Sequence, residues 1–271
     1  MIEQYIPIIL SLISAGIFAG LLAGLFGVGG GMVIVPVLFF LFQNMGVSPE
    51  SAMIIATATS LASIVPTSLS SIRSHHQKGN VDFLLFRRWL PAICAGVFLG
   101  SWLVTQVPGT WFTILFGTIA VLSSLNMLFR ASKSALTDSL PSSLWQNLIA
   151  SGIGFFSAMI GIGGGTLSVP VLTACNYPTH KAVGTSAAIG LAISLPGAVT
   201  MLIMGSAPSD APIGTVGLVN FLGLACIVPL TVLCAPIGAA LAAKLDSNIL
   251  KKSFAVLLFV TGLRMLAQLV L

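Results

Sequence analysis

The sequence predicts an all-α integral membrane protein made of two inverted copies of one helical unit, and two observations lead to this fold class. Of the 271 residues, 56% are hydrophobic and only 6% are charged, whereas soluble domains carry about 25% charged residues. The mean hydropathy is +1.08. A soluble chain cannot cover that much apolar surface, but lipid tails accept apolar side chains on every face. The second observation is an internal repeat that spans nearly the whole chain.

Apolar stretches give the candidate transmembrane segments. A helix needs about 20 residues to cross the hydrocarbon core, and we expect about 8–10 transmembrane segments. The range reflects the second and seventh stretches, which are short, follow glycine clusters, and are either half-helices that cross or re-entrant pieces that return. The stretches are 6–26, 32–46, 51–72, 84–106, 110–129, 145–162, 165–177, 182–206, 214–243 and 249–270.

The net charge of +5 follows the positive-inside pattern rather than the pattern of a nucleic-acid-binding face. Basic residues crowd the loops that follow the third, fifth, seventh and ninth stretches, whereas the opposite loops carry Glu3, Glu50 and Asp210. If the second and seventh stretches cross the membrane, all four basic loops lie on one side, and the positive-inside rule then places these loops in the cytoplasm and both termini in the periplasm. We therefore expect a multi-pass protein of the bacterial inner membrane. The basic loop residues are Arg73, Lys78, Arg87, Arg88, Arg130, Lys133, Lys181, Lys244, Lys251 and Lys252.

The repeat is recognised by a glycine-rich motif, since Gly20–Leu38 reappears as Gly154–Leu172 with its glycines, its proline and the closing Val-Leu in register. We predict a first transmembrane repeat over 1–130, a cytoplasmic linker over 131–143 and a second repeat over 144–271. Each repeat contains an odd number of crossings whether or not its short stretch crosses, so the second copy is inverted relative to the first. Inverted repeats with interrupted helices are typical of secondary transporters, whose substrates bind near the bilayer midplane.

The two glycine clusters are the first candidate binding elements. They comprise Gly29, Gly30 and Gly31, and Gly163, Gly164 and Gly165. Glycine costs about 1 kcal/mol relative to alanine inside a helix, and Pro36 and Pro170 follow as further expected helix breaks. A helix that restarts after such a break directs free N–H groups and its positive dipole end into a cavity, where they bind an anion. Close helix packing is the alternative use of the glycines, but the matched pair favours binding.

A pair of hydroxyl residues follows each cluster. Thr59 and Ser60 correspond to Thr185 and Ser186 in the second repeat. Hydroxyl groups donate hydrogen bonds to an anion without adding charge to the membrane interior. The alternative is a hydrogen bond to a carbonyl of the same helix, which is common for Ser and Thr.

Several kinds of site are not expected. All six acidic residues lie in or beside loops, whereas cation carriers and proton relays usually hold a carboxylate within the membrane. The cysteines have no CxxC spacing, and His75, His76 and His180 are expected in cytoplasmic loops. The apolar stretches therefore offer no acid–base pair and no metal cluster, and we expect neither enzymatic activity nor a metal or cofactor.

The duplicated Gly-x-Gly-Gly-Gly-x-x-x-x-Pro-Val-Leu motif, the paired (Ala/Gly)-Thr-Ser motif and the loop Ser71–Asp82 together resemble the TauE/SafE family of sulfite exporter-like permeases. The resemblance covers essentially the full chain. It implies a membrane transporter for sulfur-containing or organic anions such as sulfite, a sulfonate, sulfoacetate or thiosulfate, without choosing among them.

Repeat, glycine breaks and resemblance together predict a secondary carrier of small oxyanions that works by alternating access. An anion channel with the same lining and a carrier of non-sulfur carboxylates are the alternatives. The expected partners are the anionic substrate, the lipid bilayer and, for coupled transport, H⁺ or Na⁺, with no nucleic acid. The oligomeric state and the direction of transport stay open.

Overall fold

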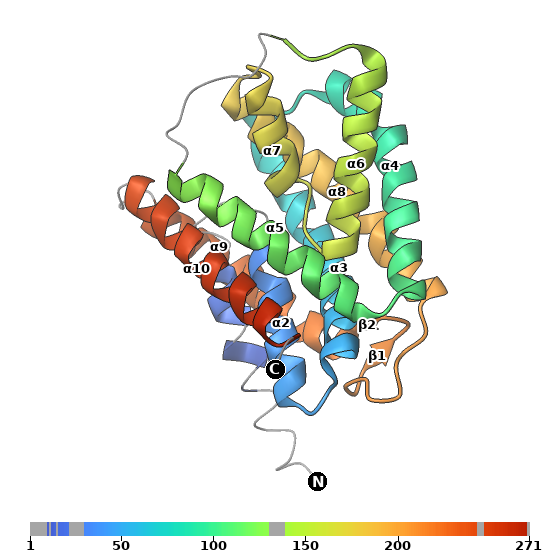
Figure 1. Ribbon diagram of the computed structural model, residues 1–271. Helices are drawn as coiled ribbons and strands as arrows, with labels where there is room; N and C mark the ends of the chain where they lie inside the picture. Colours follow the sequence, from blue (N-terminus) through green and yellow to red (C-terminus); the bar gives the residue numbers. More distant parts are fainter. Residues whose placement is uncertain are drawn as a thin grey trace.

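The computed structural model describes residues 10, 12–14, 16–21, 30–129, 139–242 and 247–269, and it is almost entirely helical (Figure 1). An apolar helix, Leu12–Leu21, precedes the labelled elements. These are α2 (Gly31–Asn44), α3 (Pro49–Gln77), α4 (Phe83–Gln106), α5 (Gly109–Phe129), α6 (Ser143–Ile160), α7 (Gly165–Ala174), α8 (Thr179–Met204), β1 (Thr215–Val216), β2 (Val219–Asn220), α9 (Phe221–Ala242) and α10 (Ser247–Ala267).

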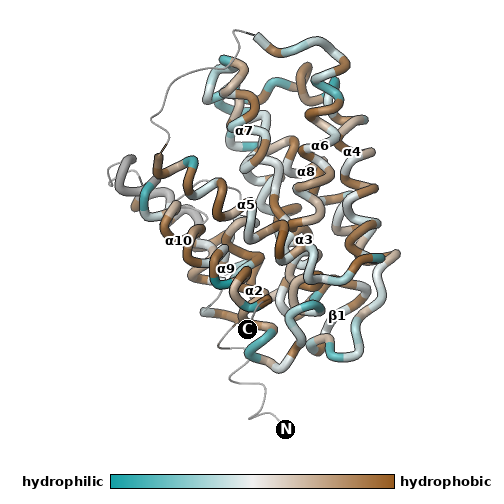
Figure 2. The backbone as a smooth tube through the Cα atoms, viewed as in Figure 1, coloured by the Kyte–Doolittle hydropathy of each residue, from teal (hydrophilic) through white to brown (hydrophobic). Residues whose placement is uncertain are grey.

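The helices have the length and surface of membrane spans. Within the described residues, α3, α4, α5 and α8 are each long and apolar enough to cross a bilayer. Large apolar side chains face outward, with Trp111 63% and Ile203 75% exposed. Hydrophobic residues recur along the whole length of the helices, whereas the most hydrophilic residues lie mainly towards helix ends and loops (Figure 2). A surface of this kind suits lipid rather than water, so the predicted all-α membrane fold is confirmed.

Helices α6 and α7 form a hairpin that enters and leaves at the same end of the molecule. Near the start of α6, the side chain of Gln146 accepts a hydrogen bond from Trp89 in the second turn of α4. Beyond the end of α7, Tyr177 donates to Asp82, which immediately precedes α4. With 10 residues, α7 is about 15 Å long, half of the roughly 30 Å hydrocarbon core. Of the two alternatives for this stretch, the structure supports the re-entrant one and the lower end of the expected segment count.

The long helices α3 and α8, which occupy equivalent positions in the two repeats, run antiparallel. The backbone N–H of Ser48, which caps α3, donates to Asp210 in the loop that follows α8, at 2.8 Å. At the other end, the N–H of Asp82 in the loop that follows α3 donates to Thr185 near the start of α8, at 3.0 Å. Figure 1 shows α7 at the top and α2 at the bottom of this pair. Antiparallel equivalent helices are what an inverted repeat requires; inversion of the complete units stays a prediction.

One expected segment boundary was wrong. The stretch 214–243 is not one segment, because β1 and β2 form a short antiparallel hairpin before α9 begins at Phe221. Its turn uses Gly217 at φ 57°, a conformation that suits glycine, and the Asn220 side chain accepts from Gly223 N and so caps α9. Hydropathy did not distinguish this hairpin from the helix that follows it.

Neither proline ends a helix. Pro36 lies inside α2 and Pro170 inside α7, each at the sixth helical residue. A proline near the start of a helix removes a single hydrogen bond to the carbonyl four residues earlier, so the helices continue through both positions. The interruptions lie at the glycines instead, where Gly30 (φ 78°) and Gly161 (φ 72°) adopt backbone conformations that other residues rarely take.

Candidate functional site

The two glycine clusters touch each other in the interior. A Cβ atom added at Gly31 would lie 2.9 Å from Gly161 O and 2.9 Å from Ile162 Cα. Only a hydrogen fits there, so the start of α2 rests directly on the turn between α6 and α7. Gly30 caps α2 and its carbonyl accepts from Val33 N and Ile34 N. Gly29 lies outside the described residues. The matched motifs thus meet in space.

The Thr-Ser pairs mostly hold the two repeats together. Ser60 donates to Gly161 O at 2.8 Å, and Thr59 accepts from Asn220 N at 2.9 Å. Thr185 accepts in the same way from Asp82 N. Asp82 and Asn220 are the residues whose side chains accept from N–H groups in the first turns of α4 and α9. Three of the four predicted hydroxyls therefore bind backbone of the opposite repeat.

Ser186 is the exception: its hydroxyl donates to Val183 O of its own helix at 2.7 Å, which is the alternative given for these hydroxyls, and the residue lines a cavity together with the second glycine cluster. The cavity has a volume of about 110 Å³ and lies between α3, α8 and the start of α7. It contains Gly163, Gly164, Gly165 and Ser186 from the predicted set, but none of Gly30, Gly31, Thr59, Ser60 and Thr185. Its other lining residues are Ile64, Thr67, Ser68, Ser71, His75, Val183, Ala187 and Gly190.

Two hydrogen-bond donors converge beside Gly190. A Cβ atom at Gly190 would lie 3.0 Å from Ser68 Oγ and 3.7 Å from Gly164 N. Ser68 is only 7% exposed, and its hydroxyl makes no hydrogen bond within the described part of the chain. Gly164 caps α7, so the free N–H groups and the positive dipole end of that helix point to the same region. Free donors at a helix start form a ready site for a negative charge.

His75 forms another part of the cavity wall. Its Nδ1 atom is buried and has no hydrogen-bond partner among the described residues. A buried polar atom without a partner is uncommon, because each loses its hydrogen bonds to water. The expectation of loop-borne histidines is wrong, because His75 and His76 belong to the last turn of α3 and His180 to the first turn of α8; of the three, His75 lines the cavity.

The cavity suits a small oxyanion. Its volume of about 110 Å³ leaves room for a few water molecules or for one compact anion. Hydroxyl groups, an imidazole and backbone N–H groups line it, and the lining includes no carboxylate. Arg73 and Lys78 flank His75 in sequence and are exposed at the same end, which makes the potential near this end positive.

A hydrogen-bond network fixes the loop beside the cavity. Tyr177 donates to Asp82 Oδ2, while Asp82 Oδ1 accepts from Leu84 N and Leu85 N. Partial burial acts to raise the pKa of Asp82, but these hydrogen bonds and the nearby Lys181 charge outweigh it and lower the pKa below its usual value. Burial and the Asp82 carboxylate raise the pKa of Tyr177. The carboxylate thus stays charged and keeps α4 capped.

The sequence contains a signal for the cavity residues that were not predicted. Ser68, Ser71 and His75 are spaced as i, i+3 and i+7, and Val183, Ser186, Ala187 and Gly190 follow the same pattern on α8. This spacing places each set on one helix face. Two facing helices with small and polar residues on one face each indicate a polar cavity between them.

Comparison with known proteins identifies the family of the chain. The family described as Sulfite exporter TauE/SafE matches residues 12–265. A probable membrane transporter protein of Haemophilus influenzae is 32% identical over 95% of this chain and 97% of its own length. A probable membrane transporter protein of Methanocaldococcus jannaschii is 27% identical over 97% of both chains, and YunE of Bacillus subtilis, also named a probable membrane transporter, is 26% identical over 95% of this chain and 97% of its own. No solved structure matches.

The chain is a multi-pass membrane transporter protein and belongs to the sulfite exporter TauE/SafE family.

Proposed function

We propose that this protein is a secondary transporter that moves small sulfur-containing or organic oxyanions across the bacterial inner membrane, with the cavity beside Gly163–Gly165 as its binding site. The single observation that carries the proposal is the convergence of the Ser68 hydroxyl and the Gly164 N–H on one spot at the start of α7. Sulfite, sulfonates, sulfoacetate and thiosulfate all carry oxygens that accept hydrogen bonds from such donors.

In a carrier that works by alternating access, the cavity is open to one side of the membrane at a time. The cavity reaches from the glycine turn to His75 at the basic end, which the positive-inside rule assigns to the cytoplasm. Towards the other end, the close contact of Gly31 with Gly161 and the Ser60 hydrogen bond shut the path. This is the inward-facing state of a carrier, and separation of the two glycine turns would expose the anion to the periplasm.

Two other functions use the same lining. An anion channel needs no alternating gate, and a carrier of non-sulfur carboxylates needs the same hydrogen-bond donors. Counterflow in proteoliposomes separates the first from a carrier, because only a carrier exchanges external labelled anion against internal unlabelled anion. Transport is either facilitated or coupled to a gradient of H⁺ or Na⁺, and flux in the same vesicles under imposed gradients distinguishes these cases.

The test is anion-dependent thermal stability of the purified protein, since a ligand that binds only the folded state raises its stability. We expect sulfite, thiosulfate or an alkyl sulfonate to stabilise the wild type. Gly190→Ala fills the space beside Ser68 Oγ and strengthens the helix by about 1 kcal/mol, so it should fold and lose the anion effect. Gly164 is less useful, because a Cβ there would lie 2.5 Å from the Ile189 side chain and disturb packing as well.

Gly152→Ala is the matched control, since a Cβ at this α6 position meets nothing within 4 Å. Ser68→Ala removes one hydrogen bond to a charged ligand, worth about 1.5–3 kcal/mol, and should weaken anion affinity at least about tenfold. If Gly190→Ala and Ser68→Ala bind the anion as the wild type does, the cavity is not the site. If only carboxylates stabilise the protein, the sulfur-anion assignment is wrong.

A further inference from the structure

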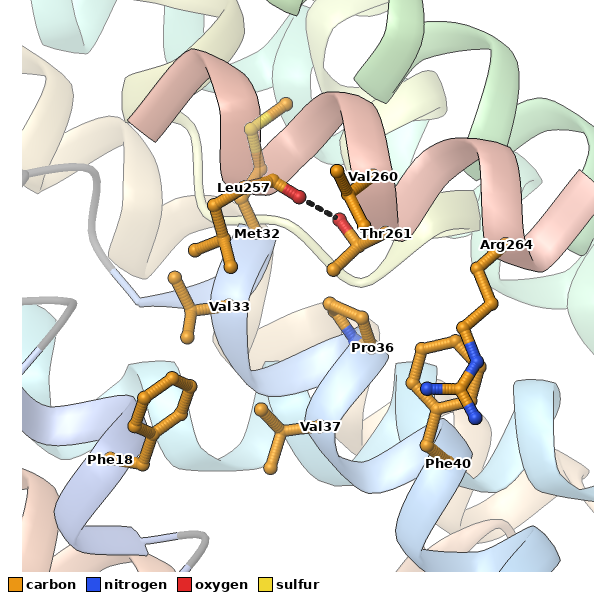
Figure 3. Close-up of a pocket in the computed structure, with 10 residues that line it drawn as sticks. All are labelled: Phe18, Met32, Val33, Pro36, Val37, Phe40, Leu257, Val260, Thr261 and Arg264. Carbon is orange, nitrogen blue, oxygen red and sulfur yellow. Dashed lines mark hydrogen bonds between the residues drawn. The ribbon is translucent and has the colours of Figure 1, made fainter. Parts of the chain in front are cut away.

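A second and larger cavity lies away from the proposed transport site, between the Leu12–Leu21 helix, α2 and α10. Its volume is about 210 Å³. Met32, Val33, Pro36, Val37 and Phe40 of α2 form one wall, and their spacing places them on one helix face. Leu257, Val260, Thr261 and Arg264 form the α10 wall, and Phe18 faces them from the first helix (Figure 3). The hydroxyl of Thr261 donates a hydrogen bond to Leu257 O in its own helix. The groove therefore has an apolar surface over most of its length.

Among the described residues that line the groove, Arg264 is the one that carries a charge. Its guanidinium carbon lies 4.4 Å from the centre of the Phe40 ring (Figure 3), and no carboxylate lies within ion-pair distance among the described residues. Arginine stays charged in proteins, and stacking on a ring leaves the edge of the guanidinium free to donate. The side chain is exposed and therefore accessible to an anion.

The charge lies at one end of the groove, near the end of an apolar helix. Arg264 belongs to the last turn of α10, and the side chain of Gln268 just beyond it accepts a hydrogen bond from Gln43 near the end of α2. From Phe40 the groove continues along α2 to Met32, which is about 12 Å deeper at 1.5 Å per residue. It ends beside Gly31, in the interior of the molecule.

We propose that this groove binds an anionic phospholipid, with one acyl chain along α2 and α10 and the phosphate on Arg264. An apolar trough that opens towards lipid, with one unpaired guanidinium at one end, complements the two chemically different parts of such a molecule. The phosphate accepts charge-assisted hydrogen bonds from arginine, and each buried methylene of the chain adds favourable transfer energy. A bound chain would fill the space between α2 and α10, which are the elements beside the first glycine turn.

The experiment compares lipid retention and thermal stability of the detergent-purified protein after addition of phosphatidylglycerol or phosphatidylcholine. We expect the wild type to retain phosphatidylglycerol in native mass spectra and to be stabilised by it, with phosphatidylcholine having little effect. Arg264→Gln should reduce phosphatidylglycerol retention about tenfold, the effect of losing one charge-assisted hydrogen-bond pair. Val260→Phe keeps the charge but fills the groove, and it should reduce retention to a similar degree.

Arg88→Gln is the matched control, because it removes an exposed arginine outside the groove. Equal losses in Arg88→Gln and Arg264→Gln would overturn the proposal in favour of general surface electrostatics. So would unchanged retention in Val260→Phe, or equal stabilisation by inorganic phosphate, which would show that the guanidinium binds a headgroup-like ion without a chain. A cooperative melting transition of each variant without added lipid reports whether the protein is folded.

Discussion

At the scale of single residues, the paired threonines show how one side chain serves two helices. Thr59 and Thr185 each accept a hydrogen bond from the backbone N–H of the residue before a helix of the other repeat, at 2.9 Å and 3.0 Å. That backbone group lies before the first helical turn, where the chain has no intrahelical acceptor to offer it. The hydroxyl therefore fixes the entry of α9 or α4 while remaining uncharged inside the membrane.

Replacement of Thr185 by valine tests this role. Valine keeps the shape but leaves Asp82 N without an acceptor, so we expect a loss of about 1–2 kcal/mol in the free energy of unfolding. Thr185→Ser keeps the oxygen and should retain most of the stability. Thermal unfolding in detergent, with the wild type beside both variants, measures the difference. Equal melting temperatures for the valine and serine variants would show that the hydrogen bond contributes nothing.

Tyr177→Phe should change the dependence of stability on pH. Because folding lowers the pKa of Asp82, its carboxylate stabilises the folded state at pH values above 3.8, the ordinary pKa of the group. This contribution is lost as the pH falls below that value. Because folding raises the pKa of Tyr177, its protonated hydroxyl stabilises the folded state at pH values below 10.0, the ordinary pKa of the group. This contribution is lost as the pH rises above that value. The wild type should therefore exceed the variant by about 1 kcal/mol near pH 7, a small value because both groups are partly exposed.

This advantage should shrink at both ends of the pH range. Hydrogen bonds from Ser51 and Ser48 lower the pKa of Asp210 to about 2, and this group titrates in both proteins. The difference between the two stability curves therefore isolates the Asp82–Tyr177 pair. A constant difference from pH 3 to pH 11 would contradict the assigned direction of both shifts.

At the scale of helices, glycines set how closely elements approach. Helices α4 and α6 run side by side, and a Cβ atom at Gly154 would lie 2.5 Å from Ile93 O. The first helix meets α9 in the equivalent way, since a Cβ at Gly20 would lie 2.7 Å from Thr231 Cα. Gly154 and Gly20 correspond in the sequence repeat. Small residues that allow close backbone approach are the usual basis of helix association in membranes.

Gly154→Ala should therefore force α4 and α6 apart. The added methyl group would meet backbone rather than a flexible side chain, and overpacking of this kind costs about 1–3 kcal/mol. Gly152→Ala on the same helix, where a Cβ meets nothing within 4 Å, should be neutral or slightly stabilising because alanine favours the helix. Parallel melting curves of the two variants make the comparison, and equal curves would exclude close packing as the role of Gly154.

Parts of this arrangement could be read from the sequence and parts could not. The matched glycine clusters predicted the helix interruptions, because glycine acts through its own backbone. The partners of Thr59 and Ser60 could not be predicted, since Asn220 and Gly161 lie 161 and 101 residues away. Ser68 and His75 required knowledge that α3 faces α8. The β1–β2 hairpin was missed because hydropathy averages over the short polar stretch before α9.

At the scale of the whole molecule, hydrogen bonds at both ends of the α3–α8 pair join the two repeats. Ser48 and Asp210 connect them at one end, and Thr185 and Asp82 at the other. The exposed basic residues Arg73, Lys78, Arg87 and Arg88 all lie at the Asp82 end, to which the proposed anion cavity also extends. A fixed orientation in the bilayer therefore decides which compartment the cavity faces.

Single cysteines test this orientation. In a variant whose native cysteines are replaced, Ser209→Cys lies beside Asp210, and Lys78→Cys lies at the basic end; both positions are exposed. The positive-inside rule places the basic end in the cytoplasm. A membrane-impermeant maleimide should therefore label Ser209→Cys in intact cells and Lys78→Cys only after the inner membrane is opened. Labelling of Lys78→Cys in intact cells, with Ser209→Cys protected, would show the opposite topology, in which the cavity faces the periplasm. Equal labelling of both in sealed cells would contradict the placement of α3 and α8 across the membrane.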